Sequence, residues 1–316
     1  MTKNKFLKNI KLALYLLTIA GIAVFLYFRK DDLAKIIELS FVDFILLLVV
    51  GLVSQFINAL LFRNNIKIFG LDLPFLEWFG LTITNTMYNY LLPARGGLAI
   101  RAVYLKKCYD FNYSHYISFT AGVFLLNLII ASFIAIISSI YLLLTNKLQS
   151  LLILVAALSV FVILLIAVFI IFRIDSGTLR HENRITSVLK KISSGINQFQ
   201  HHKTKIIILA IIQTIFIFSL SLRLYVAYQI IGIQVDFIIL ILINSFVAFS
   251  MIISITPGNL GIKEGLIGIS SSLLLISTET AILGAIIDRV MAILIIFSFG
   301  LIYSNKLLKK MPVSID

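Results

Sequence analysis

The chain has 316 residues, of which 60% are hydrophobic and only 13% are charged, and its mean hydropathy is +1.06. A soluble domain of this length needs far more polar surface, so the composition excludes the ordinary soluble enzymes and binding domains. The formal net charge is +13, and Cys108 is the only cysteine, so no disulfide can form within one chain. The apolar runs are long and continuous, which favours membrane helices over a barrel of short alternating strands.

Eight apolar segments follow one another along the chain: 12–28, 41–62, 75–92, 117–144, 150–172, 206–231, 237–256 and 280–304. Four lysines precede the first segment, and no small-residue cleavage site follows it, which indicates a retained signal-anchor helix. Two shorter apolar stretches, 97–105 and 262–277, come directly after the third and the seventh segments. Each of these pairs is interrupted by proline and glycine.

The lysines and arginines indicate how these segments cross the membrane. If 75–107 and 237–277 are hairpins that return to their own side, most of the 27 basic residues lie on the cytoplasmic side. We therefore predict an all-α polytopic membrane protein with about six full spans and two oppositely oriented re-entrant helical hairpins. Both termini are then cytoplasmic, and the hairpins form the inverted pseudo-repeat that many transporters contain.

A single transmembrane domain is expected over residues 1–316. Its pseudo-halves are 1–172 and 206–316, and the basic cytoplasmic loop 173–205 joins them. The loop carries seven basic residues, and we expect it to lie on the anionic inner leaflet of the cell membrane rather than to bind nucleic acid.

The two interrupted stretches read "PARGGLAIR" and "PGNLGIKEG". Both contain Pro-x-x-x-Gly, through Pro93 and Gly97 in the first and through Pro257 and Gly261 in the second. Proline ends the incoming helix, glycine allows the turn, and a short helix then starts near each glycine. Because broken backbone at membrane depth leaves N–H and C=O groups unpaired, it must be buried in protein or line a wet cavity.

The chemistry of these stretches favours an anion. New helix N-termini present N–H groups and the positive end of the helix dipole, and arginine binds two phosphate oxygens at once. The predicted substrate-binding residues are Asn85, Asn89, Arg95, Gly96, Gly97, Arg101, Gly258, Gly261, Lys263, Glu264 and Arg289. The alternative is that proline and glycine only kink helices, that the arginines reach the interface, and that the polar side chains only join helices.

Four further charges lie at membrane depth: Arg223, Glu264, Asp288 and Arg289. Such charges usually pair or serve function, so Glu264 or Asp288 either exchanges a proton or forms a structural ion pair. The sequence contains no Walker A motif, no set of metal ligands and no nucleophile–base cluster. We therefore expect neither a metal nor a cofactor, no ATP-driven pumping by this chain alone, and no catalytic chemistry.

Three stretches resemble motifs of the lysylphosphatidylglycerol synthase transmembrane region family, also called flippase-like integral membrane proteins. They are "LLPARGGLAIRAVYL", "TPGNLGIKEGLIG" and "AILGAIIDRV". The positions that match the family pattern are Pro93, Gly97, Arg101, Pro257, Gly261, Glu264 and Arg289. The resemblance implies two inverted halves with re-entrant hairpins and a role in moving lipids between leaflets. The soluble synthase domain is missing, so aminoacyl-phospholipid synthase activity is not expected.

The leading hypothesis is thus a lipid translocase that moves a phospholipid or a polyprenyl-phosphate-type lipid. The headgroup would lie between the two hairpin tips, and Arg101→Ala would abolish transport without unfolding the protein. The alternatives are an accessory subunit of a separate lipid-modifying enzyme or glycosyltransferase, and a membrane-embedded transferase in such a pathway.

Overall fold

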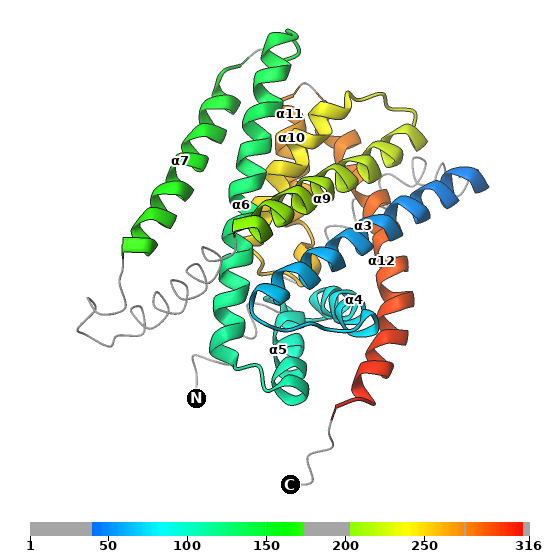
Figure 1. Cartoon of the computed structure of the whole chain (residues 1–316). Helices are drawn as coiled ribbons and strands as arrows, with labels where there is room; N and C mark the ends of the chain where they lie inside the picture. Colours follow the sequence, from blue (N-terminus) through cyan, green and yellow to red (C-terminus); the bar gives the residue numbers. More distant parts are fainter. Residues whose placement is uncertain (1–39, 149, 174–202, 275, 312–316) are drawn as a thin grey trace, which may run out of the picture.

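The computed structural model describes residues 40–148, 150–173, 203–274 and 276–311 (Figure 1). The predicted signal-anchor helix 12–28 and most of the loop 173–205 lie outside these residues. The described part of the chain contains helices and turns and no strand. Its α-helices are α3 (Phe41–Ile68), α4 (Phe75–Leu91), α5 (Gly96–Tyr109), α6 (Tyr113–Leu144), α7 (Leu152–Arg173), α9 (Lys203–Ile230), α10 (Phe237–Val247), α11 (Ile262–Ser272) and α12 (Thr278–Leu308).

Five of these helices are long and apolar enough to cross a membrane: α3, α6, α7, α9 and α12. They coincide with five of the predicted spans, so the prediction of an all-helical, multi-pass membrane protein is confirmed. The total number of spans and the re-entry of the two hairpins stay predictions, because α4 and α10 are shorter than a full span.

Side chains at several helix starts show why the helices begin where they do. Ser40 precedes α3 and accepts a hydrogen bond from the N–H of Asp43 at 3.2 Å. Asp236 precedes α10 and accepts one from the N–H of Ile238 at 3.0 Å. These caps satisfy backbone donors that the first helical turn leaves free.

The contacts between helices follow the same order in the two pseudo-halves. A long helix (α3 or α9) packs on a hairpin helix (α4 or α10), which packs on its return helix (α5 or α11), which packs on a second long helix (α6 or α12). The incoming hairpin helices also exchange partners, since α4 packs on α12 and α10 packs on α6. The inverted pseudo-repeat itself stays a prediction.

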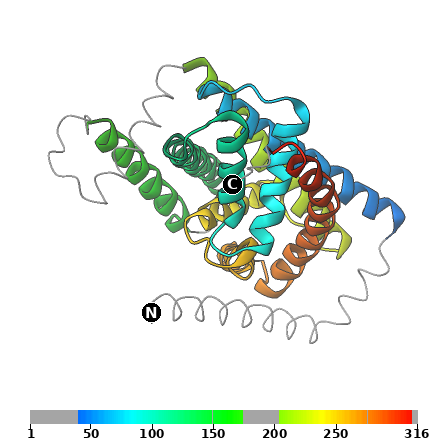
Figure 2. The same ribbon diagram turned by 90° about the horizontal axis from the view of Figure 1, so that it is seen from below.

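Helices α3 and α9 lie side by side and run in opposite directions (Figures 1 and 2). Ser54 Oγ donates to the carbonyl of Ser219 at 3.3 Å, and Lys205 Nζ lies 3.5 Å from the carbonyl of Lys67. The contacts pair rising residue numbers in α3 with falling residue numbers in α9, so the two helices are antiparallel. Antiparallel packing of corresponding helices is expected where two halves are inverted.

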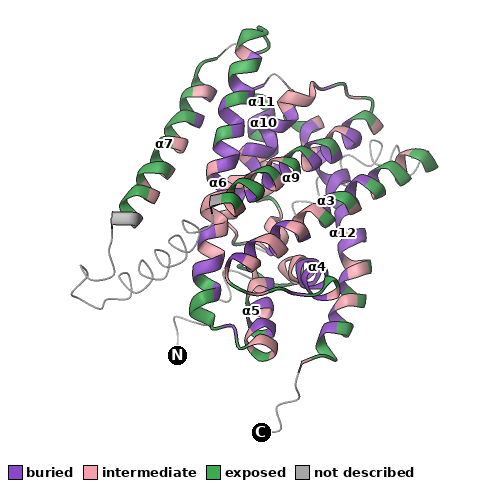
Figure 3. Ribbon diagram, in the orientation of Figure 1, coloured by how far each residue is buried: buried purple, intermediate pink, exposed green. Residues whose placement is uncertain are grey.

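Helix α12 packs on α3, α4, α9 and α11, whereas α7 packs on α6 and lies at the edge of the bundle (Figure 3). Along its buried side, α12 approaches its neighbours at glycines. A Cβ on Gly284 would lie 1.9 Å from the ring of Tyr228 in α9, and one on Gly300 would lie 2.7 Å from the sulfur of Met87 in α4. Small residues at these places allow close helix packing.

The two hairpins differ in how their incoming helices end. In the first, α4 ends at Leu91, two residues before Pro93, as predicted. In the second, the prediction of a continuous segment 237–256 that ends at Pro257 is wrong. Helix α10 ends at Val247 and tightens into a 3₁₀ turn, η1 (Ala248–Met251), well before the proline. A short 3₁₀ turn, η2 (Pro257–Asn259), then precedes α11.

Side chains hold the turn that follows η1. Ser254 Oγ lies 3.1 Å from the carbonyl of Ser250 and 3.0 Å from that of Met251. Asn259 Nδ2 also donates to the Ser250 carbonyl, at 3.2 Å. The Asn259 contact joins η2 back to the end of η1, which stabilises the turn between them.

Candidate functional site

The turn of the first hairpin is built from residues in the left-handed backbone region. Ala94 and Arg95 have φ values of 52° and 55°, which non-glycine residues adopt rarely and at a cost of about 1–3 kcal/mol. Gly97 then packs directly on the incoming helix, because a Cβ there would lie 2.0 Å from the carbonyl oxygen of Asn85. The hairpin is therefore closed tightly, and Gly97 is the position that permits it.

The turn of the second hairpin has a similar character. Gly258, Asn259 and Gly261 all have positive φ values. Gly258 packs against the ring of Tyr90 from the first hairpin, since a Cβ on Gly258 would lie 2.5 Å from the ring. The second turn therefore contacts the first one directly.

Polar contacts join the two turns at the same place. The N–H of Ala94 donates to the carbonyl of Ile255 at 3.4 Å, and Arg95 Nε donates to Ser254 Oγ at 2.7 Å. We call this region the tip junction and define it by Tyr90, Ala94, Arg95, Ser254, Ile255 and Gly258. The structure thus brings together two motifs that are about 160 residues apart in sequence.

Arg95 is the cation of the tip junction. Its guanidinium carbon lies 4.9 Å from the ring centre of Phe124 in α6, in addition to the hydrogen bond to Ser254. Arg95 is half-buried, and the residues around the first turn, from Leu91 to Ala94, are exposed. No carboxylate among the described residues forms an ion pair with Arg95.

Arg101 lies elsewhere, within the packed interior. It is only 9% exposed, and its Nε donates to the hydroxyl of Tyr116 in α6 at 2.8 Å. Its guanidinium carbon lies 4.3 Å from the ring centre of Phe62 in α3. Arg101 therefore joins α5 to α6 and α3, and the structure does not bring it to the tip junction.

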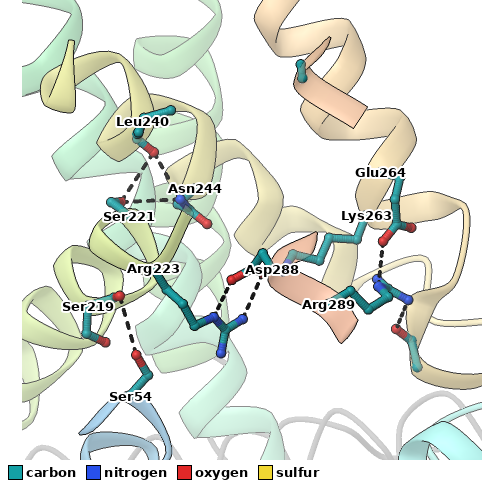
Figure 4. A network of polar contacts seen from close by, with 12 residues as sticks. Ser54, Ser219, Ser221, Arg223, Leu240, Asn244, Lys263, Glu264, Asp288 and Arg289 are labelled. Carbon is teal, nitrogen blue, oxygen red and sulfur yellow. Dashed lines mark hydrogen bonds and ion pairs between the residues drawn. The ribbon is translucent and has the colours of Figure 1, made fainter. Parts of the chain in front are cut away.

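The other three cations at membrane depth contact carboxylates (Figure 4). Arg223 in α9 forms a two-pronged pair with Asp288 in α12, in which Nη2 donates to Oδ2 at 2.9 Å and Nε donates to Oδ1. Lys263 Nζ lies 3.4 Å from the same carboxylate. Two cations thus share one buried anion and connect α9, α11 and α12.

Glu264 and Arg289 form a second buried pair (Figure 4). Arg289 Nε lies 2.5 Å from Glu264 Oε1, and Arg289 Nη1 donates to the carbonyl of Gly258 at 3.2 Å. Arg289 Nη2 is buried and has no hydrogen-bond partner among the described residues. Arg289 therefore links the ion pair to the tip junction, and its Nη2 group remains available as a donor.

The first backbone N–H groups of the return helices are occupied by side chains of the protein. Asn89 Oδ1 accepts from the N–H of Gly97 at 3.0 Å, and Glu264 Oε2 accepts from the N–H of Gly261 at 2.8 Å. One N–H group at the start of each return helix is therefore already occupied, and anion binding by the helix N-termini stays a prediction. Of the remaining predicted residues, Asn85 contacts Gly97 through its carbonyl, while its buried Oδ1 has no hydrogen-bond partner among the described residues, and Gly96 packs on Leu92.

Two residues of this region had no signal in the sequence. Phe124 is an ordinary apolar residue of α6, and only its position over the Arg95 guanidinium gives it a role. Tyr90 stands next to the predicted polar face of α4, but its contact with Gly258 depends on how the two halves meet. Neither contact can be inferred from spacing within one segment.

A polar hollow of about 440 Å³ lies at the end of α9 and the start of α10. It is lined by Tyr225, Gln229, Gln234, Val235 and Asp236, so it contains none of the predicted site residues. Among the described residues, no group of three or more His, Cys, Asp or Glu side chains is arranged to hold a metal ion.

Comparison with known proteins adds one match. The model of a family described as the lysylphosphatidylglycerol synthase TM region matches residues 10–300. The match covers both hairpins and the helices around them. A search of curated proteins found no match.

Proposed function

Because the chain belongs to the family of lysylphosphatidylglycerol synthase transmembrane regions, we propose that it is a lipid translocase. The family and the five apolar helices indicate a multi-pass membrane protein of lipid metabolism or transport. Within that class, the proposed activity is movement of an anionic or phosphate-bearing lipid between leaflets without ATP hydrolysis. The substrate is then a phospholipid or a polyprenyl-phosphate-type lipid, and the protein forms no covalent intermediate with it.

The observation that carries this proposal is that some cations at membrane depth contact a carboxylate and others do not. Arg223, Lys263 and Arg289 contact carboxylates, whereas Arg95 and Arg101 have no carboxylate partner among the described residues. Arg101 is enclosed by Tyr116 and Phe62, so Arg95, which is half-buried beside the exposed first turn, is the unpaired cation that a headgroup can reach. A charge in a membrane is costly unless it is paired or serves function. An anionic headgroup at the tip junction would supply the missing counter-charge.

The geometry also supports a phosphate as that anion. The Arg95 guanidinium is a planar fork that fits two phosphate oxygens. Arg289 already contacts the tip junction, because its Nη1 donates to the carbonyl of Gly258. Its Nη2 is a buried donor that a ligand oxygen would satisfy. We propose that the headgroup binds at Arg95 first and that Arg101 supports the site through packing.

The proposal is tested with purified protein in liposomes that contain a fluorescent anionic phospholipid or a fluorescent neutral one. An impermeant quencher reports how fast lipid from the inner leaflet becomes accessible. The proposal predicts faster access for the anionic lipid than in protein-free liposomes. Rates equal to those of empty liposomes for phospholipids and for a polyprenyl phosphate would contradict it.

A further inference from the structure

The Arg95 side chain is held at two points before any ligand is present. Its Nε donates to Ser254 Oγ at 2.7 Å, and its guanidinium carbon lies 4.9 Å from the ring centre of Phe124. The two contacts come from distant parts of the chain, because Phe124 belongs to α6 and Ser254 follows α10. The Nη1 and Nη2 groups form no hydrogen bond or ion pair with the described residues, so both stay available as donors.

The Ser254 hydroxyl is well suited to this contact. Its hydrogen is directed to the backbone, since Oγ lies 3.1 Å from the Ser250 carbonyl and 3.0 Å from the Met251 carbonyl. The oxygen therefore presents a lone pair toward Arg95 Nε and accepts from it. Because the backbone of η1 fixes the hydroxyl, the hydroxyl in turn fixes the plane of the guanidinium.

Resting on the proposed function, we propose that Ser254 is a positioning residue for Arg95. It anchors Nε so that Nη1 and Nη2 face the headgroup as a rigid pair of donors for two oxygens of a lipid phosphate. Arginine has a long side chain that loses much rotamer freedom when it becomes ordered. Holding it in place beforehand reduces the entropy that headgroup binding must overcome, which increases affinity.

The test measures binding rather than transport. Equilibrium binding of a soluble short-chain phosphatidylglycerol to the detergent-purified protein is compared between wild type and Ser254→Ala. The expected result is an affinity about three- to tenfold weaker for Ser254→Ala, the cost of ordering one long side chain when the headgroup binds. Ser254→Thr keeps the hydroxyl and should bind within about twofold of wild type.

Ser132→Ala is the matched control. Ser132 is a buried serine of α6 whose hydroxyl also contacts the carbonyls three and four residues earlier, at 3.0 and 2.9 Å. It contacts no arginine among the described residues, so its loss should leave phosphatidylglycerol binding unchanged. If Ser254→Ala fails to fold, Ser254→Cys provides the test, because a thiol is a weaker hydrogen-bond acceptor than a hydroxyl and should weaken binding in the same direction.

The outcomes separate this inference from the proposed function. If folded Ser254→Ala binds the probe as tightly as Ser132→Ala does, or if folded Ser254→Cys binds like wild type in its place, the positioning role is wrong. If Ser254→Ala weakens binding and Ser254→Thr restores it, the role is supported. If the variants show this pattern of binding but the wild-type protein moves no lipid in liposomes, only the translocase function is overturned.

Discussion

Asp288 and Arg289 are consecutive residues of α12, yet their side chains contact different partners on different helices. Asp288 pairs with Arg223 of α9 and Lys263 of α11, while Arg289 pairs with Glu264 of α11 and donates to the carbonyl of Gly258. Neighbouring positions on a helix point in different directions, so one turn of α12 contacts both the second hairpin and helix α9. This turn connects the tip junction to the rest of the protein.

The first prediction concerns Asp288. Replacing it with asparagine should leave Arg223 buried without a counter-charge, because Asp288 is 2% exposed and contacts two cations. We expect a loss of about 3–5 kcal/mol in stability, as for the breaking of other buried ion pairs. Thermal unfolding of the purified protein in detergent measures it. An unchanged unfolding temperature would show that the network is not a structural element.

A second prediction compares two glycines. Gly97→Ala should destabilise the protein by about 1–3 kcal/mol, because its Cβ would meet the Asn85 carbonyl oxygen at 2.0 Å and the backbone must move. Gly265→Ala is the matched control in α11, where no heavy atom of the described residues lies within 4 Å of the added Cβ. There alanine should be neutral or stabilise the helix by about 0.5–1 kcal/mol. Equal unfolding temperatures for the two variants would contradict the close contact between α4 and α5.

Arg101 gives a third prediction, which revises the expectation from sequence. Because Arg101 is enclosed by Tyr116 and Phe62, Arg101→Ala should lower stability as well as activity. Tyr116→Phe isolates the hydrogen bond, since it removes only the hydroxyl that accepts from Arg101 Nε. It should cost about 1–3 kcal/mol, the penalty for leaving a buried charged donor unsatisfied. If both variants unfold at the wild-type temperature, Arg101 is not a packing residue.

The fourth prediction is a pH dependence outside the spans. Lys147, after α6, forms an ion pair with Asp236, before α10. The hydrogen bond from Lys147 lowers the pKa of the Asp236 carboxyl, against an opposing effect of burial, and the same bond raises the pKa of Lys147. The contribution of Asp236 is therefore complete above the unfolded carboxyl pKa of about 3.9 and is lost as the pH falls through the lowered folded value.

The contribution of Lys147 has the opposite sign. It is present below the unfolded lysine pKa of about 10.4 and is lost as the pH rises through the raised folded value. Unfolding temperatures of wild type and Lys147→Gln should therefore differ by a small, constant amount at intermediate pH, and they should converge at low and high pH. A difference that does not change with pH would show that the pair does not act electrostatically.

The sequence predicted much of the fold because membrane helices obey simple rules. Long apolar runs gave the five apolar helices, and the paired proline and glycine gave the positions of both turns. The end of α10 was not predictable from Pro257, because the helix tightens into η1 before the proline is reached and Asn259 then bonds back to the Ser250 carbonyl. Side-chain hydrogen bonds of this kind depend on the local turn, which the hydrophobic pattern does not specify.

The candidate site was predicted less completely. The charged residues were identifiable because charges at membrane depth are rare. Their roles depended on which helices meet, and this is why Arg101 turned out to be enclosed by Phe62 and Tyr116. The contact of Arg95 with Ser254 joins segments 159 residues apart, and no periodicity within either segment indicates it.

Lipid movement in liposomes with Arg95 variants tests the central claim most directly. Arg95→Ala should abolish the acceleration of anionic lipid exchange, because the cation of the tip junction is removed, while Arg95→Lys should retain part of it through charge alone. Lys147→Gln, far from the tip junction in sequence and in contact with Asp236, serves as the control and should transport like wild type. Full transport by folded Arg95→Ala would contradict the account.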